Sequence, residues 1–76
     1  MSKYIVWFQE VNGIVQECIG GDSVMKIDDR KTINTIVKDI YSMSQYKYRP
    51  KNAIGFKVCI GTSILNMKPY TKFIPI

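Results

Sequence analysis

One segment of the chain has its apolar residues at helical spacing, and this limits what the remainder can form. The segment runs from Asp28 to Ser44, DDRKTINTIVKDIYSMS. Its apolar stripe, with residues three or four positions apart, consists of Ile33, Ile36, Val37, Ile40 and Tyr41. Such residues lie on one side of an α-helix, and the other positions are charged or polar. The sequence therefore predicts one amphipathic helix that needs a sheet to cover its apolar side.

The strongest turn signal is Asn12-Gly13, between two runs rich in β-branched and aromatic residues, 3–11 and 14–19. A type I′ turn needs positive φ at both central residues, which Asn and Gly tolerate best. We therefore expect a β-hairpin with a two-residue turn. A three-residue turn with a bulge at Gly13 is the alternative, and it would redistribute the side chains between the two faces.

With a two-residue turn, the hairpin has two apolar faces. One face carries Ile5, Trp7, Val11, Ile14 and Cys18. The other carries Tyr4, Val6, Phe8, Val15 and Ile19. Periodicity does not decide which face meets the helix. The second face also needs a cover, either from the C-terminal segment or from another molecule.

Alternation and turn residues predict the remaining elements. In chain order these are a short strand at 23–27, a strand at 53–60, a brief pairing segment at 64–68 and an edge strand at 70–74. Asp28 or Asp29 is expected to cap the helix, because a carboxylate accepts N–H groups of the first turn. The predicted fold class is a small α+β domain with an antiparallel sheet. It comprises an N-terminal hairpin or three-stranded meander, one helix packed on one face, and one or two C-terminal strands.

The chain has 76 residues, which we expect to form a single domain, 1–76. A domain of this size buries only roughly 60% of the surface of its unfolded chain. No apolar run approaches the ~18 residues that a membrane span requires. The N-terminal apolar run ends at Gln9 and Glu10, too early for a signal peptide. The expectation is a cytoplasmic protein without membrane contact.

Catalytic groups are scarce. The sequence has no histidine and no glycine-rich phosphate loop, and its six carboxylates are scattered. Cys18 and Cys59 are too far apart for a metal-binding pair and are expected to be buried thiols, bridged only if they are neighbours across strands. Asp28 and Asp29 form a paired-carboxylate site only if they do not serve as caps. We therefore expect no enzyme activity, no cofactor and no metal.

Binding is better supported by the composition. The net charge of +5 attracts polyanions or an acidic protein surface. Segment 46–52, YKYRPKN, concentrates cations and aromatic rings, which contact phosphates and bases respectively. The candidate nucleic-acid or partner contacts are Tyr46, Lys47, Tyr48, Arg49 and Lys51, with Lys57, Lys68 and Lys72 extending the patch. The alternative is a solvated loop whose tyrosines fold back over the helix end.

Aromatic residues exceed what one short helix covers, so Trp7, Tyr70 and Phe73 are candidate protein-interface residues. An exposed edge strand also allows pairing with a partner's sheet or a homodimer. A two-sided core closed by the C-terminal tail is the alternative. Twelve isoleucines against one leucine indicate AT-rich coding, which low-GC bacteria and many of their phages share.

These features lead to three functional hypotheses. The first is a non-enzymatic small binding protein that acts stoichiometrically on a macromolecular partner, as a phage- or mobile-element-type regulator or inhibitor of a host protein does. The second is an RNA or single-stranded nucleic-acid binding protein that uses segment 46–52. The third is a dimerising structural subunit.

Overall fold

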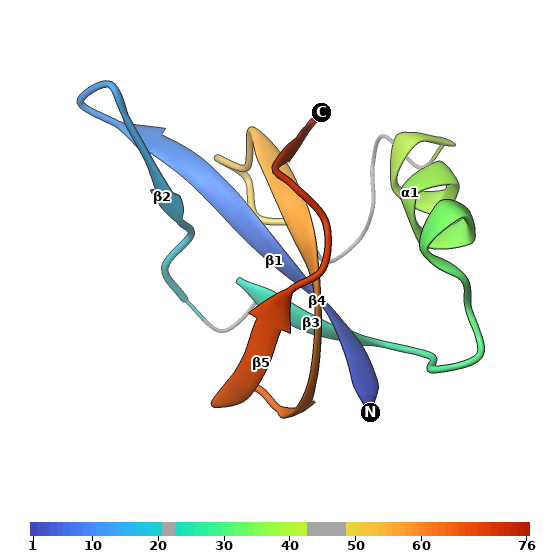
Figure 1. Cartoon of the computed structure of the whole chain (residues 1–76). Helices are drawn as coiled ribbons and strands as arrows, with labels where there is room; N and C mark the ends of the chain where they lie inside the picture. The colour runs from blue at the N-terminus through green and yellow to red at the C-terminus, as the bar shows by residue number, and fades with distance from the viewer. Residues whose placement is uncertain (21–22, 43–48) are drawn as a thin grey trace.

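Two long antiparallel strands form the centre of the sheet. The computed structural model describes residues 1–20, 23–42 and 49–76. Strand β1 (Ser2–Val11) pairs with β4 (Gly55–Ser63) over seven residue pairs. Figure 1 shows both strands passing through the middle of the molecule.

Each long strand pairs with two short strands along its other edge. The second half of β1 pairs with β2 (Ile14–Glu17), and its first half pairs with β3 (Val24–Ile27). On β4, the partners are β5 (Asn66–Pro69) and β6 (Ile74–Pro75). The result is a curled antiparallel sheet beside a single described helix (Figure 1). The predicted α+β class with an antiparallel sheet is confirmed.

The N-terminal hairpin has the predicted two-residue turn. Asn12 and Gly13 have φ angles of 53° and 80°, as a type I′ turn requires. The residues on either side of the turn lie directly opposite each other. Further along, the Cys18 N–H donates to the Trp7 carbonyl at 2.9 Å. The predicted register is confirmed, and the alternative with a bulge at Gly13 is wrong.

Both faces of the sheet carry a buried cluster, as the two apolar faces of the hairpin predict. We call them the odd face and the even face, after the residue numbers in β1. The odd-face cluster contains Ile5, Trp7, Cys18, Ile27, Phe56 and Val58, together with Ile36 and Ile40 of the helix. The even-face cluster contains Tyr4, Val6 and Cys59. The two cysteines therefore lie on opposite faces, and neither forms a disulfide.

The C-terminal segment covers part of the even face. The Phe73 ring meets the Phe8 ring edge-on, with centroids 5.9 Å apart. It also lies directly over Gly55, where a Cβ atom would collide with the ring. The Lys57 ammonium lies 5.1 Å from the centre of the Phe8 ring. Of the two covers that the sequence allowed, the chain supplies one itself over this part of the face.

Helix α1 (Ile33–Ser42) begins later than predicted. Its cap is Thr32, whose hydroxyl accepts the Thr35 N–H at 3.3 Å. The prediction of Asp28 or Asp29 as the cap is wrong. The Asp28 carboxylate instead accepts the Arg30 N–H at 3.0 Å, so it is used within its own turn. The predicted helix end at Ser44 lies outside the described residues.

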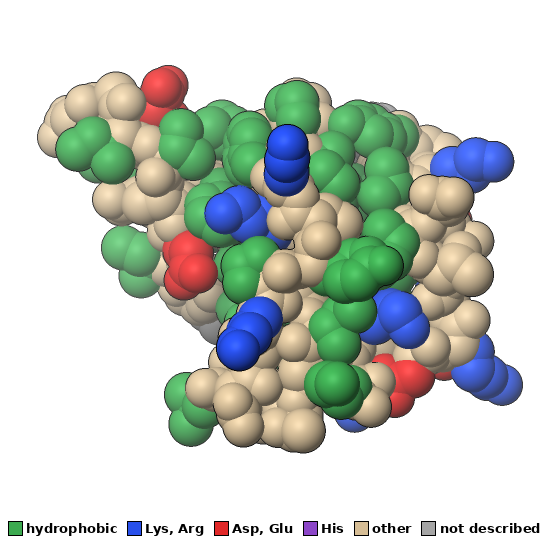
Figure 2. Space-filling view, viewed as in Figure 1, with side chains coloured by type: hydrophobic (Ala, Val, Ile, Leu, Met, Phe, Trp, Pro, Cys, Tyr) green, Lys and Arg blue, Asp and Glu red, His purple; other side chains and the backbone are tan. Residues whose placement is uncertain are grey.

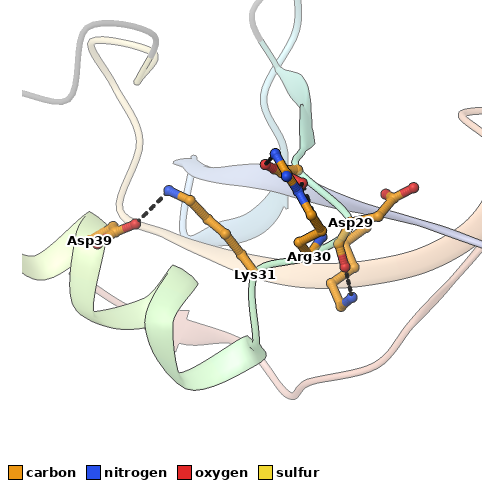
Figure 3. Close-up of polar contacts among 6 residues, drawn as sticks. Asp29, Arg30, Lys31 and Asp39 are labelled. Carbon is orange, nitrogen blue, oxygen red and sulfur yellow. Dashed lines mark hydrogen bonds and ion pairs between the residues drawn. The ribbon is translucent and has the colours of Figure 1, made fainter.

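Polar contacts connect the segment before the helix to the helix itself (Figure 3). The Lys31 ammonium, just before the helix, lies 2.8 Å from the Asp39 carboxylate, which belongs to the second half of α1. At the other end, the Tyr41 hydroxyl donates to the Pro75 carbonyl at 2.7 Å. Tyr41 is therefore at the surface despite its place in the apolar stripe, whereas Ile36 and Ile40 are buried.

The last strand is shorter than predicted. Only β6 continues the ladder, and the predicted strand at 70–74 is wrong over 70–73. There the Val58 N–H donates to the Thr71 hydroxyl at 3.0 Å rather than to a carbonyl. The Val58 carbonyl accepts the N–H groups of both Tyr70 and Thr71. A side chain thus replaces one backbone partner, so regular pairing is interrupted between the two prolines.

Replacing Thr32 with Ala should lower the free energy of unfolding by about 1 kcal/mol, because the helix loses its capping oxygen. Urea unfolding followed by the fluorescence of Trp7, the single tryptophan, measures this change. Asp29→Ala is the matched control, since only the carbonyl of Asp29 makes a hydrogen bond within the described residues. Equal losses in the two variants would show that Thr32 does not cap the helix.

Candidate binding surfaces

The most exposed apolar part of the sheet is the end of the N-terminal hairpin. We call residues 10–19 the hairpin arm; in Figure 1 it projects from the body of the molecule. All four residues of β2 are exposed. Large apolar side chains between 41% and 85% exposed gather here: Val11, Ile14, Val15 and Ile19. Val11 and Ile14 lie directly opposite each other on one face, and Val15 and Ile19 lie on the other. Single exposed apolar residues are ordinary, but several on one short ribbon favour an interaction surface.

The arm projects because the sheet narrows there. Pairing between β1 and β4 ends at Phe8 and Gly55, and the Ile54 N–H donates to the Phe8 carbonyl at 2.9 Å. Beyond Phe8, among the described residues, β1 has only β2 as a partner. A two-stranded ribbon buries little surface, so its side chains stay exposed even on the face that is buried elsewhere.

Hydrogen bonding leaves the outer edge of β2 available. In an antiparallel pair, alternate residues direct their N–H and C=O groups toward the partner strand. Cys18 bonds to β1, so Gln16 and Ile14, at two-residue intervals, also face β1. The N–H and C=O groups of Val15 and Glu17 therefore point away from β1. No described strand pairs along this outer edge.

The arm differs in charge from the rest of the chain. Residues 4–25 contain no Lys or Arg and three carboxylates, while the remaining residues carry all eleven cations and three carboxylates. Glu10 and Glu17 are both exposed on the arm. Figure 2 shows acidic side chains beside hydrophobic ones where the hairpin projects. The arm is thus an acidic, apolar surface on a basic protein.

The structure does not gather the predicted cations into one patch. Tyr46, Lys47 and Tyr48 lie outside the described residues. Arg49 is half-buried, and Lys51 is exposed.

Lys57 and Lys68 lie on opposite faces of the sheet. Lys57 is opposite Val6 on the even face, and Lys68 is opposite Ile60, whose other neighbour is Lys3 on the odd face. Lys72 is exposed in the segment between β5 and β6. Figure 2 shows Lys and Arg side chains separated by other residues across the visible face. The predicted extension of the basic stretch by these three lysines is therefore divided between surfaces.

Of the three candidate interface aromatics, only Tyr70 is well exposed, at 64%. Trp7, by contrast, is 0% exposed and packs edge-on against Phe56 in the odd-face cluster, with ring centroids 5.6 Å apart. Phe73 is half-buried against Phe8. The sequence contained a signal for the hairpin arm, because Val11, Ile14 and Val15 beside the turn are apolar. It did not reveal where β4 ends.

The acidic residues before the helix do not form a shared site. In Figure 3 the Asp29 carboxylate points away from the pair formed by Asp28 and Arg30. Hydrogen bonds from Arg30 hold the pKa of the Asp28 carboxyl below its usual value. Among the described residues, no three His, Cys, Asp or Glu side chains are close enough to hold a metal ion. A cavity of about 20 Å³ under Lys31 and Asp39 has room for roughly one water molecule.

Both thiols are protected. Burial raises the pKa of Cys18, and burial together with the nearby Glu17 carboxylate raises the pKa of Cys59, which Lys57 partly offsets. The thiolate is the nucleophilic form, so a raised pKa and burial both lower reactivity.

Comparisons with known proteins give no relative from which to infer a function. No family model, curated protein or solved structure matches this chain. Across residues 1–20, 23–42 and 49–76, no helix combines the length and apolarity that crossing a bilayer requires. Function is therefore inferred from the surfaces of the described residues.

Native chain should react with a thiol reagent such as DTNB at least about tenfold more slowly than chain in denaturant, because each thiol must first be exposed. Folding raises each thiol pKa, so deprotonation favours the unfolded chain. Stability should fall as the pH rises above the ordinary thiol pKa of about 8.5. The single variants Cys18→Ser and Cys59→Ser assign each rate, and a thiol as reactive in the native chain as in denaturant would refute the protection.

Proposed function

We propose that this chain is a non-enzymatic binding module that acts stoichiometrically on a partner protein, with the hairpin arm as its principal contact. One observation carries the proposal: large apolar side chains are exposed on both faces of a projecting hairpin whose outer edge has no described partner, Val11 and Ile14 on one face and Val15 and Ile19 on the other. A small protein exposes such a group at the risk of aggregation, so its retention favours a binding role.

In this proposal the helix packs on the odd face of the sheet and leaves the arm uncovered. The supporting observation is that Ile36 and Ile40 belong to the same buried cluster as Ile5. On the same face, Val11 and Ile14 of the arm are exposed. The helix thus covers the odd face in the body of the sheet, and the arm remains available to a partner.

Such a module affects its partner by occupying a surface, as a phage- or mobile-element-type regulator or inhibitor does. The small size and the isoleucine-rich composition support this class. The proposed location is the cytoplasm, where reducing conditions keep buried thiols such as Cys18 and Cys59 in the free form.

Affinity capture from a host lysate, with and without nuclease, tests the role of the arm. Ile14→Ser should lower capture of the specific partner by about tenfold or more, as expected for an apolar contact at the centre of an interface. Leu65→Ser is the matched control, because Leu65 is 98% exposed in the turn between β4 and β5, away from the arm. Both sites are exposed, so neither change should alter the urea midpoint. Equal capture by the two variants would exclude the arm as the contact.

Nucleic-acid binding is the second candidate, favoured by the position of all eleven cations outside residues 4–25. In this case a gel shift with single-stranded RNA or DNA should weaken steeply as salt increases, because bound cations release counterions. The triple variant Lys47→Ala/Arg49→Ala/Lys51→Ala should abolish the shift, and Ile14→Ser should leave it unchanged. Absence of any shift at low salt excludes this candidate.

A further inference from the structure

The outer edge of β2 offers a ready template for another strand. Val15 and Glu17 each direct one N–H and one C=O group outward, which supplies two donors and two acceptors to an added strand. The edge of β1 on the other side of the arm offers fewer groups, because beyond Phe8 only Glu10 directs its backbone groups away from β2. An extended segment therefore gains the most hydrogen bonds along β2.

The side chains along this edge specify the chemistry of the added strand. Val15 and Glu17 lie on the even face, where Glu10 is directly opposite Val15. Directly opposed side chains in neighbouring strands are about 5 Å apart, close enough for an ion pair or an apolar contact. On this face, an added strand complements the edge best with a basic residue opposite Glu17 and an apolar residue opposite Val15. On the odd face, Ile14 favours an apolar neighbour.

Charge argues against a second copy of this chain as the added strand. Pairing two β2 edges brings the Glu17 side chains of both copies onto neighbouring strands, and the arm itself, residues 10–19, contains no cation to neutralise them. Like charges on neighbouring strands are destabilising. The same carboxylates repel the phosphates of a nucleic acid.

We propose, on the basis of the function proposed above, that the arm binds its partner by strand addition. The occupant is an extended segment of another protein with a basic residue opposite Glu17 and apolar residues opposite Val15 and Ile14. Its backbone pairs with Val15 and Glu17, and its cation contacts the Glu17 carboxylate.

A displayed library of random ten-residue linear peptides, selected on the full chain, tests this inference. The selected peptides should carry a basic residue two positions from an apolar residue, so that the two lie opposite Glu17 and Val15. Val15→Pro should lower their affinity by about tenfold or more, because proline removes an outward N–H while the bonds between β1 and β2 are retained. Val15→Thr, which keeps both the N–H group and the β-branched shape, should bind normally.

Charge reversal gives a second test that does not depend on how the proline variant folds. Glu17→Lys should lose the basic peptides and select acidic ones. The fluorescence of Trp7 and the urea midpoint confirm that each variant is folded.

Three results would overturn strand addition: no peptide selected above background, selected peptides without basic residues, or affinities unaffected by both Val15→Pro and Glu17→Lys. The proposed function is distinguished by Ile14→Ser. If that change abolishes capture of the partner and Val15→Pro does not, the arm binds through side chains alone. Loss of strand addition would then leave the binding module intact.

Discussion

The pairing of β1 with β4 is the interaction on which the rest of the structure depends. Its register places Trp7 opposite Phe56 and Ile5 opposite Val58, and these four residues belong to the odd-face cluster that also contains Ile36 and Ile40. The same register assigns alternate residues to a second buried cluster on the even face. Each long strand pairs with the other along one of its two edges. The four short strands therefore pair along the remaining edge of β1 or of β4.

The limits of that pairing also determine which surface is exposed. Val11 and Ile14 lie on the same face as Ile5, yet they are exposed because β4 does not extend beside the arm. Apolar character alone therefore does not separate core from interface in this chain. Extra strands bury apolar residues in the body of the sheet, and their absence leaves chemically similar residues on the arm exposed. Adding one more strand to the arm would continue the same arrangement.

The sequence predicted what local chemistry determines. Asn12-Gly13 specified the turn, and thereby the register and both faces of the hairpin. The prediction failed where the structure depends on a competing nearby group or on a residue distant in the sequence. Asp28 resembles a helix cap, but Arg30 supplies a nearer partner, and Thr32 takes the cap instead. The interruption of the last strand depends on Thr71 reaching Val58, thirteen positions away in the chain.

The distribution of charge illustrates the same limit. The net charge of the chain suggested a basic binding stretch, because a net charge is a sum and contains no information about where the positive and negative side chains lie. The structure separates Lys57 from Lys68 and places Glu10 and Glu17 on a projecting arm. The Lys57 ammonium lies over the ring of Phe8, the residue directly opposite Glu17, so the carboxylate nearer the body of the sheet has a cation on its own face. Glu10 lies nearer the turn. Because charges are screened over about 8 Å at physiological ionic strength, the acidic character of the arm is local and depends on these few side chains rather than on the net charge of the chain.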